Sequence, residues 1–365
     1  MLQRDELGMK RLVRCLAAAG LMGAAGVASA QSSVTLYGIV DGSILYTSHT
    51  MNMLTGQNAG HQFSFTDSGM SGSNFGMRGA EDLGGGMRAV FALESGISVA
   101  NGKFSNSNGN FFGRQAWIGM ESPYGTVKAG LQYSPFFLSL YQTDPRGMSY
   151  FGSGLVSYVN NVYVTGLFNS NALTYTSPEI AGIQAMGMFA MGGAAGDFQA
   201  GRQYSASLRY HIGGFTLTGA LYSGNAGGTA TSTPVPSTVE FVGRTIGASY
   251  RFQNSLTISA SYALYKVAQS FDNSVYSGGL SYMITPYLDV DAGVWYTRDG
   301  NDGSNHSLLA STGVQFFLSK RTTLYGQFGY VNNHGRMDTG LSINNALFEV
   351  SGSTVGASIG IRHLF

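Results

Sequence analysis

The chain has 365 residues, of which 11% are charged, and its mean hydropathy is +0.03. Soluble domains have about a quarter of their residues charged, and bundles of membrane-spanning helices are far more hydrophobic, so the composition fits neither class. The formal net charge of +1 provides no basic face for nucleic acid. Gly, Ser, Thr, Asn and Gln take the place of charged residues, as expected for a membrane barrel whose wall alternates lipid-facing and water-facing positions.

The first thirty residues have the pattern of a secretory signal. A basic stretch at 10–14 precedes an apolar stretch at 15–27, and Ala28-Ser29-Ala30 forms a small-residue cleavage site. We expect residues 1–30 to be removed and residues 31–365 to form the mature domain. Acidic residues before Met9 suit such a signal poorly, so we expect translation to start at Met9.

Removal of this segment changes both the charge and the thiol content. It takes four basic and two acidic residues from totals of 20 and 19, which leaves 16 and 17, a net charge of −1. The single cysteine, Cys15, leaves with the signal. The mature chain is therefore expected to have neither disulfides nor thiol chemistry.

Period-two alternation of apolar and polar residues dominates the mature chain. It is clearest in residues 215–221, 256–262, 288–294 and 355–365, where one face is apolar and the other carries Thr, Ser, Asp or Gly. Runs of about ten residues with this period are typical of tilted strands that cross a membrane. No stretch sustains a helical period, so we expect an all-β, transmembrane, antiparallel up-and-down barrel.

The connectors between these runs alternate between short and long. The short ones have tight-turn chemistry: Leu83-Gly84-Gly85-Gly86, Pro123-Tyr124-Gly125, Ile212-Gly213-Gly214, Gln253-Asn254, Thr285-Pro286 and Lys320-Arg321. Long, Gly/Ser/Asn-rich connectors are expected at 101–110, at 225–237 with Pro234 and Pro236, and at 332–345. Counting the runs gives about sixteen strands in one domain, which lies in the range of outer-membrane barrels.

The longest connector, Ser134 to Asn171, is unlike the others because it is rich in Phe and Tyr. So many aromatic side chains need a surface to pack on, and inside a barrel that surface is the inner wall. We therefore expect this loop to fold inward and narrow the lumen.

Four stretches combine into a family pattern: Val34-Thr35-Leu36-Tyr37-Gly38, the run from Gly76 to Gly86, Gly113-Arg114-Gln115-Ala116-Trp117-Ile118-Gly119, and the ending Gly360-Ile361-Arg362-His363-Leu364-Phe365. Together they resemble the trimeric general porins of β-proteobacteria. The resemblance spans the mature chain, with its densest matches before residue 135.

This resemblance implies a barrel of about sixteen strands that forms a homotrimer in the bacterial outer membrane, with the third extracellular loop folded inward. It also implies basic side chains on the wall that face acidic ones on the loop. Phe365 corresponds to the residue that the barrel-assembly machinery recognises in the family. The implied partners are this machinery, outer-membrane lipids and lipopolysaccharide, and the diffusing ions and small hydrophilic solutes.

The chain departs from the family at the constriction. Positions where the family usually has basic residues carry Asn74, Leu131, Asn169 and Asn171. The constriction loop has only Asp144 and Arg146 as charges, and these nearly cancel. We therefore expect a weak transverse field.

Three arginines are candidates for the pore wall. Arg78 and Arg88 share the parity of the polar positions in their strands, and Arg114 shares that of Ala116, opposite Trp117. Charge on the lipid-facing side at mid-depth costs roughly 2–4 kcal/mol, which also favours the lumen. We expect Arg78 and Arg114 to line the pore and Arg88 to lie near the periplasmic turn. The alternative is that these arginines only solvate the lumen and form hydrogen bonds with loop carbonyls.

Other polar groups have simpler explanations than catalysis or metal binding. Asp289 and Asp291 share one strand face, about 7 Å apart, but their alternation with apolar residues favours a water-filled lumen over a catalytic pair. Residues 299–303 lack the final Glu of a calcium loop, so a plain turn is expected, with a weak surface cation site as the alternative. Six scattered histidines indicate no metal site, and no cofactor is expected.

The sequence thus predicts a non-enzymatic outer-membrane channel for passive diffusion, with a weak anion preference. An outer-membrane lipase or protease is a second hypothesis, although the only G-x-S-x-G match, residues 356–360, lies in the alternating run 355–365 and not at a strand-to-helix turn. An adhesin or receptor barrel is a third, although no N-terminal plug domain is recognisable.

Overall fold

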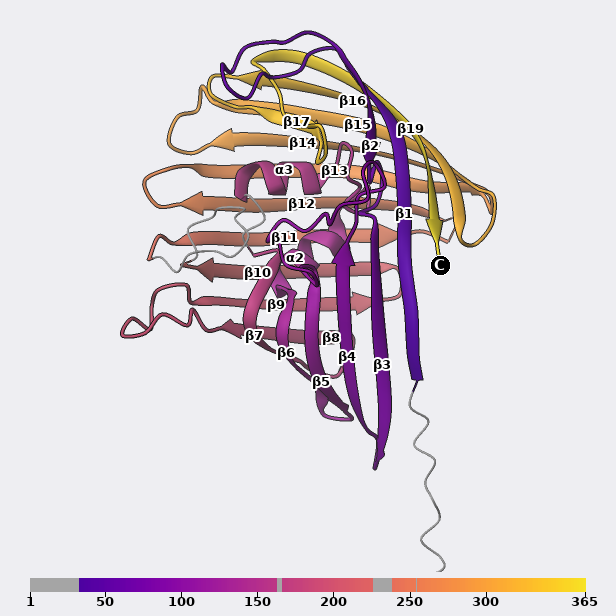
Figure 1. The fold of residues 1–365 in the computed structure, drawn as a ribbon, viewed down its shortest axis with the longest axis vertical. Coiled ribbons are helices and arrows are strands. Elements are labelled where there is room, and N and C mark those ends of the chain that lie inside the picture. The colour runs from indigo at the N-terminus through magenta and orange to yellow at the C-terminus, as the bar shows by residue number, and fades with distance from the viewer. Residues whose placement is uncertain (1–32, 163–165, 226–237, 254) are drawn as a thin grey trace, which may run out of the picture.

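The computed structural model describes residues 33–162, 166–225, 238–253 and 255–365, which form a closed antiparallel β-barrel (Figure 1). The predicted all-β fold is confirmed. The predicted signal segment, Pro234 and Pro236 of one long connector, and Asn254 of one short turn lie outside the described residues.

The wall strands run antiparallel to their neighbours throughout the described residues. They are β1 (Ser33–Thr47), β2 (Gln62–Asp67), β3 (Asn74–Gly84), β4 (Met87–Gly96), β5 (Gln115–Ser122), β6 (Gly125–Tyr133), β7 (Phe168–Thr176), β8 (Ile183–Ala190), β9 (Gln203–Ile212), β10 (Phe215–Gly224), β11 (Phe241–Arg251), β12 (Leu256–Val267), β13 (Asp272–Thr285), β14 (Leu288–Asp299), β15 (His306–Phe317), β16 (Thr322–His334) and β19 (Gly352–Leu364). The first strand pairs with the last, from Ile39 opposite Leu364 to Thr47 opposite Gly356, and this pairing closes the sheet. Closure satisfies the backbone groups of every strand, as a lipid environment requires.

One barrel strand is interrupted. Both β2 and β3 pair with β1, at its C-terminal and N-terminal parts, so they are two halves of one strand, and the barrel has the predicted sixteen strands within the described residues. Between them, residues 68–73, the inward segment, leave the wall. The Asp41 carboxylate accepts hydrogen bonds from the backbone N–H groups of Gly69, Met70 and Ser71, at 3.1, 3.2 and 2.7 Å. These bonds hold the inward segment against the lumenal side of β1.

Short turns and long loops lie at opposite ends of the barrel, as predicted. The short turns include those that join β3 to β4, β9 to β10 and β15 to β16. One expectation is wrong in part: residues 332–345 are not an open connector. His334 ends β16, and a short turn then leads into a hairpin of β17 (Thr339–Ser342) and β18 (Ala346–Phe348). The hairpin forms because it packs inward on the third loop, where Ile343 N–H donates to Tyr150 O at 2.9 Å.

Alternation along the strands separates an outer and an inner face. In β14, Asp289, Asp291 and Trp295 point inward and are buried, whereas Val294 and Tyr296 point outward and are exposed. The outer face is apolar because it contacts lipid, and the inner face is polar except where the third loop covers it. The two aspartates therefore face the lumen, as expected.

The third loop contains two helices, which the sequence did not predict: α2 (Pro135–Thr143) and α3 (Gly154–Val162). Ser134 caps α2, because its hydroxyl oxygen accepts a hydrogen bond from Phe137 N–H at 3.1 Å. Most residues of both helices are buried, so neither has the polar stripe that reveals an amphipathic helix. No helix of the described residues is long and apolar enough to cross a membrane.

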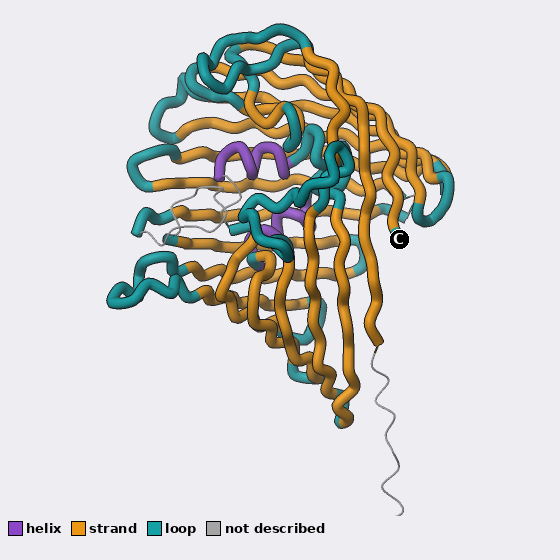
Figure 2. Tube along the Cα trace, in the orientation of Figure 1, coloured by secondary structure: helices purple, strands orange, loops and turns teal. Residues whose placement is uncertain are grey.

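Both helices lie inside the barrel, as expected for an inward-folded loop (Figure 2). The α2 helix packs on β9 to β12, and α3 packs on β13, β14 and β17. The core of the molecule is thus the layer between loop and wall, where Phe136 contacts Tyr158, Tyr222 and Tyr265 with ring centroids 6.3 Å away in each case. Burial of one such ring stabilises the loop by roughly 1.5–3 kcal/mol.

Candidate functional site

The tip of the third loop, residues 144–153 between α2 and α3, crosses the lumen. Its backbone is bonded on both sides: Tyr150 N–H donates to Met70 O of the inward segment at 2.9 Å, and Tyr150 O accepts from Ile343 N–H at 2.9 Å. The third loop, the inward segment and the β17–β18 hairpin therefore form one connected constriction.

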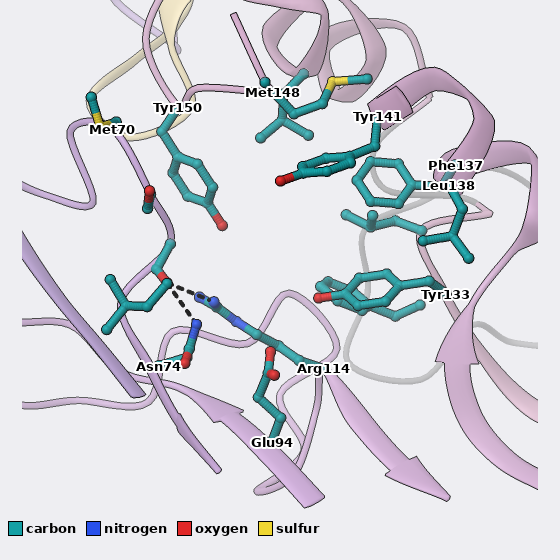
Figure 3. A pocket seen from close by; sticks show the side chains of 17 residues that line it. Met70, Asn74, Glu94, Arg114, Tyr133, Phe137, Leu138, Tyr141, Met148 and Tyr150 are labelled. Carbon is teal, nitrogen blue, oxygen red and sulfur yellow. Dashed lines mark hydrogen bonds between the residues drawn. The ribbon is translucent and has the colours of Figure 1, made fainter. Parts of the chain in front are cut away.

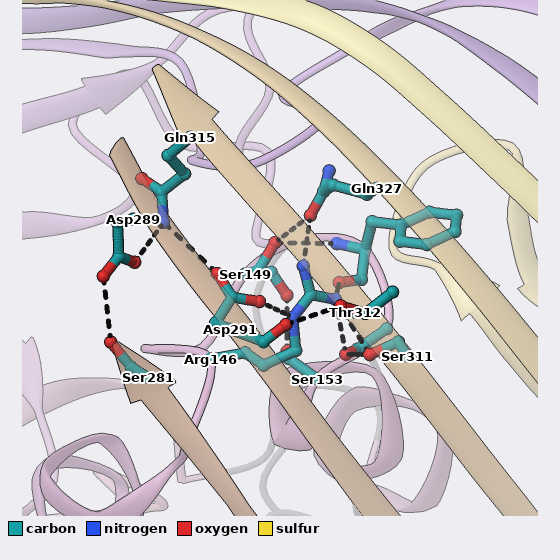
Figure 4. A network of polar contacts seen from close by, with 12 residues as sticks. Arg146, Ser149, Ser153, Ser281, Asp289, Asp291, Ser311, Thr312, Gln315 and Gln327 are labelled. Atoms are coloured by element: carbon teal, nitrogen blue, oxygen red, sulfur yellow. Dashed lines mark hydrogen bonds and ion pairs between the residues drawn. The ribbon is translucent and has the colours of Figure 1, made fainter. Parts of the chain in front are cut away.

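Arg146 fixes the loop tip to the wall (Figure 4). Its guanidinium forms an ion pair with Asp291 of β14, and the two side chains are only 1% and 6% exposed. It also donates to Gln327 Oε1 of β16 and Ser311 Oγ of β15, each at 2.9 Å. Arg146 is thus matched by a wall carboxylate and not by Asp144, and its charge contributes little to the field of the lumen.

Asp144 organises the loop backbone. It ends α2, and its carboxylate accepts hydrogen bonds from the N–H groups of Arg146, Met148 and Gly154 at 3.0, 2.9 and 2.8 Å. Burial raises the pKa of this carboxyl, and the three N–H groups oppose that rise. The arrangement shapes the loop tip and leaves no oxygen of Asp144 lining the two lumenal cavities described next.

A first cavity, of about 350 Å³, lies between the third loop and the wall near β3 to β6 (Figure 3). Arg114, which is only 6% exposed, directs its guanidinium into it and donates through Nη1 to Gly72 O at 3.1 Å. No ion pair with Arg114 occurs among the described residues. The nearby Glu94 carboxylate instead accepts from Tyr37 Oη and Gln115 Nε2, at 2.9 and 3.1 Å.

A second cavity, of about 300 Å³, lies on the other side of the loop tip. Asp289 and Asp291 line it on β14, and Arg362 of β19 lines it while donating through Nη1 to Ser71 Oγ at 3.1 Å. Both cavities have Met70, Ser71, Tyr141 and Gly147 in their linings, so they are adjacent parts of one lumen. That lumen has charged and aromatic side chains in its lining and is narrowed from three sides.

Comparison with known proteins identifies this architecture. The profile of the Gram-negative porin family matches residues 17–336. The chain belongs to this family. An outer membrane porin protein of Bordetella pertussis is 30% identical, over 96% of this chain and 99% of that one, and outer membrane porin protein 32 of Delftia acidovorans is 28% identical over the same shares. Among solved structures, an anion-selective porin from Comamonas acidovorans superposes with a TM-score of 0.78 at 25% identity, over 92% of this chain and all of that one.

This porin therefore forms a water-filled channel in the bacterial outer membrane, through which ions and small hydrophilic solutes diffuse passively. Short turns of such barrels face the periplasm, so the long loops and the β17–β18 hairpin are extracellular. The inward third loop narrows the channel part-way along its length.

The arginines predicted for the wall of the porin lie at different places. Arg114 lines the first cavity. Arg78 lies outside both cavity linings, with its guanidinium 5.5 Å from the centroid of the Tyr37 ring. Arg88 forms an exposed ion pair with Glu121 at 3.3 Å beside the β3–β4 turn, as expected from its sequence position.

The parity argument for Arg114 was wrong. Trp117 faces the lumen, where the ammonium of Lys128 lies 4.3 Å from its ring centroid, and Ile118 faces outward and is 66% exposed. Arg114 reaches the lumen because it precedes β5, which begins at Gln115, so strand alternation does not govern its side chain.

Two lumenal features of the porin escaped the sequence reasoning. Arg362 alternates with the outward-facing Ile359 and Ile361, so parity alone would have found it. The inward segment has no such signal, because its position depends on Asp41, which lies 28 to 30 residues away from the residues it binds.

Proposed function

We propose that this porin has a weak preference for anions, set mainly by Arg114. The proposal is supported by one observation: a guanidinium lies almost fully buried in the constriction wall without a paired carboxylate among the described residues. In a narrow, low-dielectric constriction such a charge is poorly screened and attracts counter-ions from the passing solution. The Comamonas relative, which is anion-selective by its name, supports the same sign.

The preference is weak because carboxylates oppose it. Arg362 adds a second positive charge to the lumen, but Glu94 and Asp289 line the same two cavities without ion-pair partners among the described residues. Arg146 and Asp291 cancel each other. Arg78 and Lys128 also face the lumen, outside both cavity linings, and add positive charge there. The reversal potential of purified channels in a KCl gradient tests the sign directly.

We infer that Asp144 and Arg146 determine the shape of the constriction and not its charge. This role is supported by the three backbone N–H groups on Asp144 and by the buried pair of Arg146 with Asp291. Passage through the pore is diffusion, and we propose that no catalytic step accompanies it, as in other porins. Hydrolysis of a fluorogenic ester or of casein by the purified porin would contradict that proposal.

We propose a homotrimer, in line with the family resemblance. An aromatic cluster on the outside of the barrel supports it. The ring centroid of Phe111 lies 4.9 Å from that of Phe104 and 6.4 Å from that of Phe75. Phe104 and Phe111 are 58% and 51% exposed. Phe75 faces outward on β3, so the cluster extends from the loop onto the wall. Exposed aromatic clusters of this kind are characteristic of protein interfaces.

Lipopolysaccharide is the proposed partner of the extracellular rim at β14 to β16. Arg298, His306 and His334 are direct cross-strand neighbours on β14, β15 and β16, at the end with the long loops. They share the outward-facing parity of Tyr296 and Leu308, and the two imidazoles stack with centroids 4.4 Å apart. Arg298 provides a positive charge and the imidazoles provide polar nitrogens at the height of the phosphate-bearing headgroups of the outer leaflet.

We also propose that the porin domain begins after a signal segment of residues 1–30, and that the barrel-assembly machinery recognises Phe365. The second point is supported by the position of Phe365, which hydrogen-bonds Gly38 in both directions, at 3.2 and 3.1 Å, where the barrel closes. N-terminal sequencing of the mature protein tests the first point.

A further inference from the structure

The cavity beside Arg114 combines one unpaired cation with three phenol hydroxyl groups. Tyr133 at the end of β6, Tyr141 of α2 and Tyr150 of the loop tip all direct their hydroxyl oxygens toward the space in front of the guanidinium (Figure 3). None of the three hydroxyls has a hydrogen-bond partner among the described residues. The guanidinium, with five N–H donors, makes one side-chain hydrogen bond there, to Gly72 O. Several donors therefore converge on one unfilled volume.

The wall of this cavity across from Arg114 is aromatic (Figure 3). The rings of Tyr133 and Phe137 are stacked at 5.5 Å with an angle of 29° between their planes, and Phe168 lies 5.5 Å from Tyr133 on another side. Phe137 is 8% exposed and lines the cavity. A solute ring placed against these faces gains both apolar burial and aromatic contact, the latter worth roughly 0.5–1.5 kcal/mol.

Gly72 leaves room for the Tyr150 hydroxyl beside the Arg114 guanidinium. A Cβ atom at this position would overlap Tyr150 Oη and would lie 2.7 Å from Arg114 Nη1. Any larger residue would therefore displace the two donors from each other. The close approach of the phenol and the guanidinium depends on this glycine.

Charge limits the solute to a single negative group. Arg114 provides one positive charge, and the Glu94 carboxylate, held by Tyr37 and Gln115, lines the same cavity. One carboxylate of a solute can lie against the guanidinium, as in other charge-assisted pairs. A second carboxylate would be repelled by Glu94.

We propose that this cavity is a saturable binding site for aromatic monocarboxylates, with the carboxylate on Arg114 and Tyr150 and the ring against Tyr133 and Phe137. The cavity, at about 350 Å³, lies at the small end of the volume range of small-molecule sites. The proposal rests on the proposed passage of anions and adds a solute class to it.

The test is block of single-channel KCl current by benzoate in planar bilayers, with acetate, cyclohexanecarboxylate and phthalate as comparison solutes. Benzoate should reduce the current with a half-saturating concentration at least about tenfold below those of acetate and phthalate, and clearly below that of cyclohexanecarboxylate. Arg114→Gln should raise the half-saturating benzoate concentration by at least about tenfold, because a hydrogen bond between two charged groups is lost. Tyr150→Phe and Gly72→Ala change no charge and should raise it about two- to tenfold.

Lys128→Gln is the matched control, since it removes one lumenal positive charge outside the cavity lining. It should leave the half-saturating benzoate concentration within about twofold. Benzoate block no stronger than acetate block would overturn the site, and so would equal effects of Arg114→Gln and Lys128→Gln. The anion preference is measured separately in KCl without benzoate, so a channel that prefers chloride but does not bind benzoate overturns this inference alone.

Discussion

Arg146 of the third loop and Asp291 of β14 form an ion pair that is almost completely removed from solvent. The two residues are 145 positions apart, and their contact fixes the loop tip to the far wall of the barrel. Loss of either partner leaves the other charge buried and alone, which destabilises such a contact by about 3–5 kcal/mol. The pair therefore keeps the constriction in one position.

Arg146→Gln and Asp291→Asn should each release the loop tip. We expect frequent transitions among conductance levels in single-channel records, where the unmodified porin gives one steady level. Arg88→Gln is the control, because it breaks an exposed pair worth about 0–1 kcal/mol. Steady single-level currents from both loop variants would show that the helices alone hold the loop.

The burial of Glu349 beside the extracellular hairpin predicts that the stability of the porin depends on pH. This carboxyl follows β18, is fully buried, and neither oxygen has a hydrogen-bond partner among the described residues. Burial raises its pKa from 4.5 to about 8, so the folded state favours the protonated acid. Its contribution to stability is complete below about pH 4.5 and is lost as the pH rises through about 8.

Thermal unfolding of the porin and of Glu349→Gln, measured from pH 5 to pH 9, tests this assignment. The amide of the variant cannot ionise. The unfolding midpoint of Glu349→Gln should therefore rise relative to that of the unmodified porin as the pH rises. A constant difference between the two midpoints across this range would show that Glu349 does not change its protonation in the folded protein.

Phe365 predicts a defect in assembly and not in conduction. Its ring fills the space beside Gly38, where a Cβ atom would overlap it. Deletion of Phe365 should lower the amount of porin in the outer membrane and leave the conductance of the assembled fraction unchanged. Quantitative immunoblots of outer-membrane fractions measure the yield, and normal yield would exclude a role of Phe365 as an assembly signal.

The aromatic cluster of Phe75, Phe104 and Phe111 is predicted to stabilise the trimer against dissociation. Phe111→Ser should lower the temperature at which trimers dissociate on mild electrophoresis, because it removes a ring from the proposed interface. Tyr124→Ser, on the exposed β5–β6 turn, is the control. A monomer from the unmodified porin under the mildest conditions would contradict the trimer, whereas equal dissociation of both variants would exclude only the cluster.

Alternation made most of the wall predictable, because a strand between lipid and water must change polarity at every residue. Alternation does not predict the third loop, which lies between the wall and the lumen and contacts both. Residues of α2 and α3 lie between wall and lumen, so their sequence shows no clean period. The pairing of Arg146 with Asp291, and the capture of the inward segment by Asp41, depend on residues brought together only by barrel closure. Arg114 was assigned to the lumen through a parity that its strand does not have, since it lies before the first residue of β5.

Reversal potentials in a KCl gradient measure whether Arg114 sets the ion preference of the constriction. The unmodified porin should show a weak preference for chloride, and Arg114→Gln should reduce or abolish it. Lys266→Gln makes the same change of charge on the outer face and should leave the reversal potential unchanged. Strong cation selectivity of the unmodified porin, or an unchanged reversal potential in Arg114→Gln, would show that other charges set the ion preference.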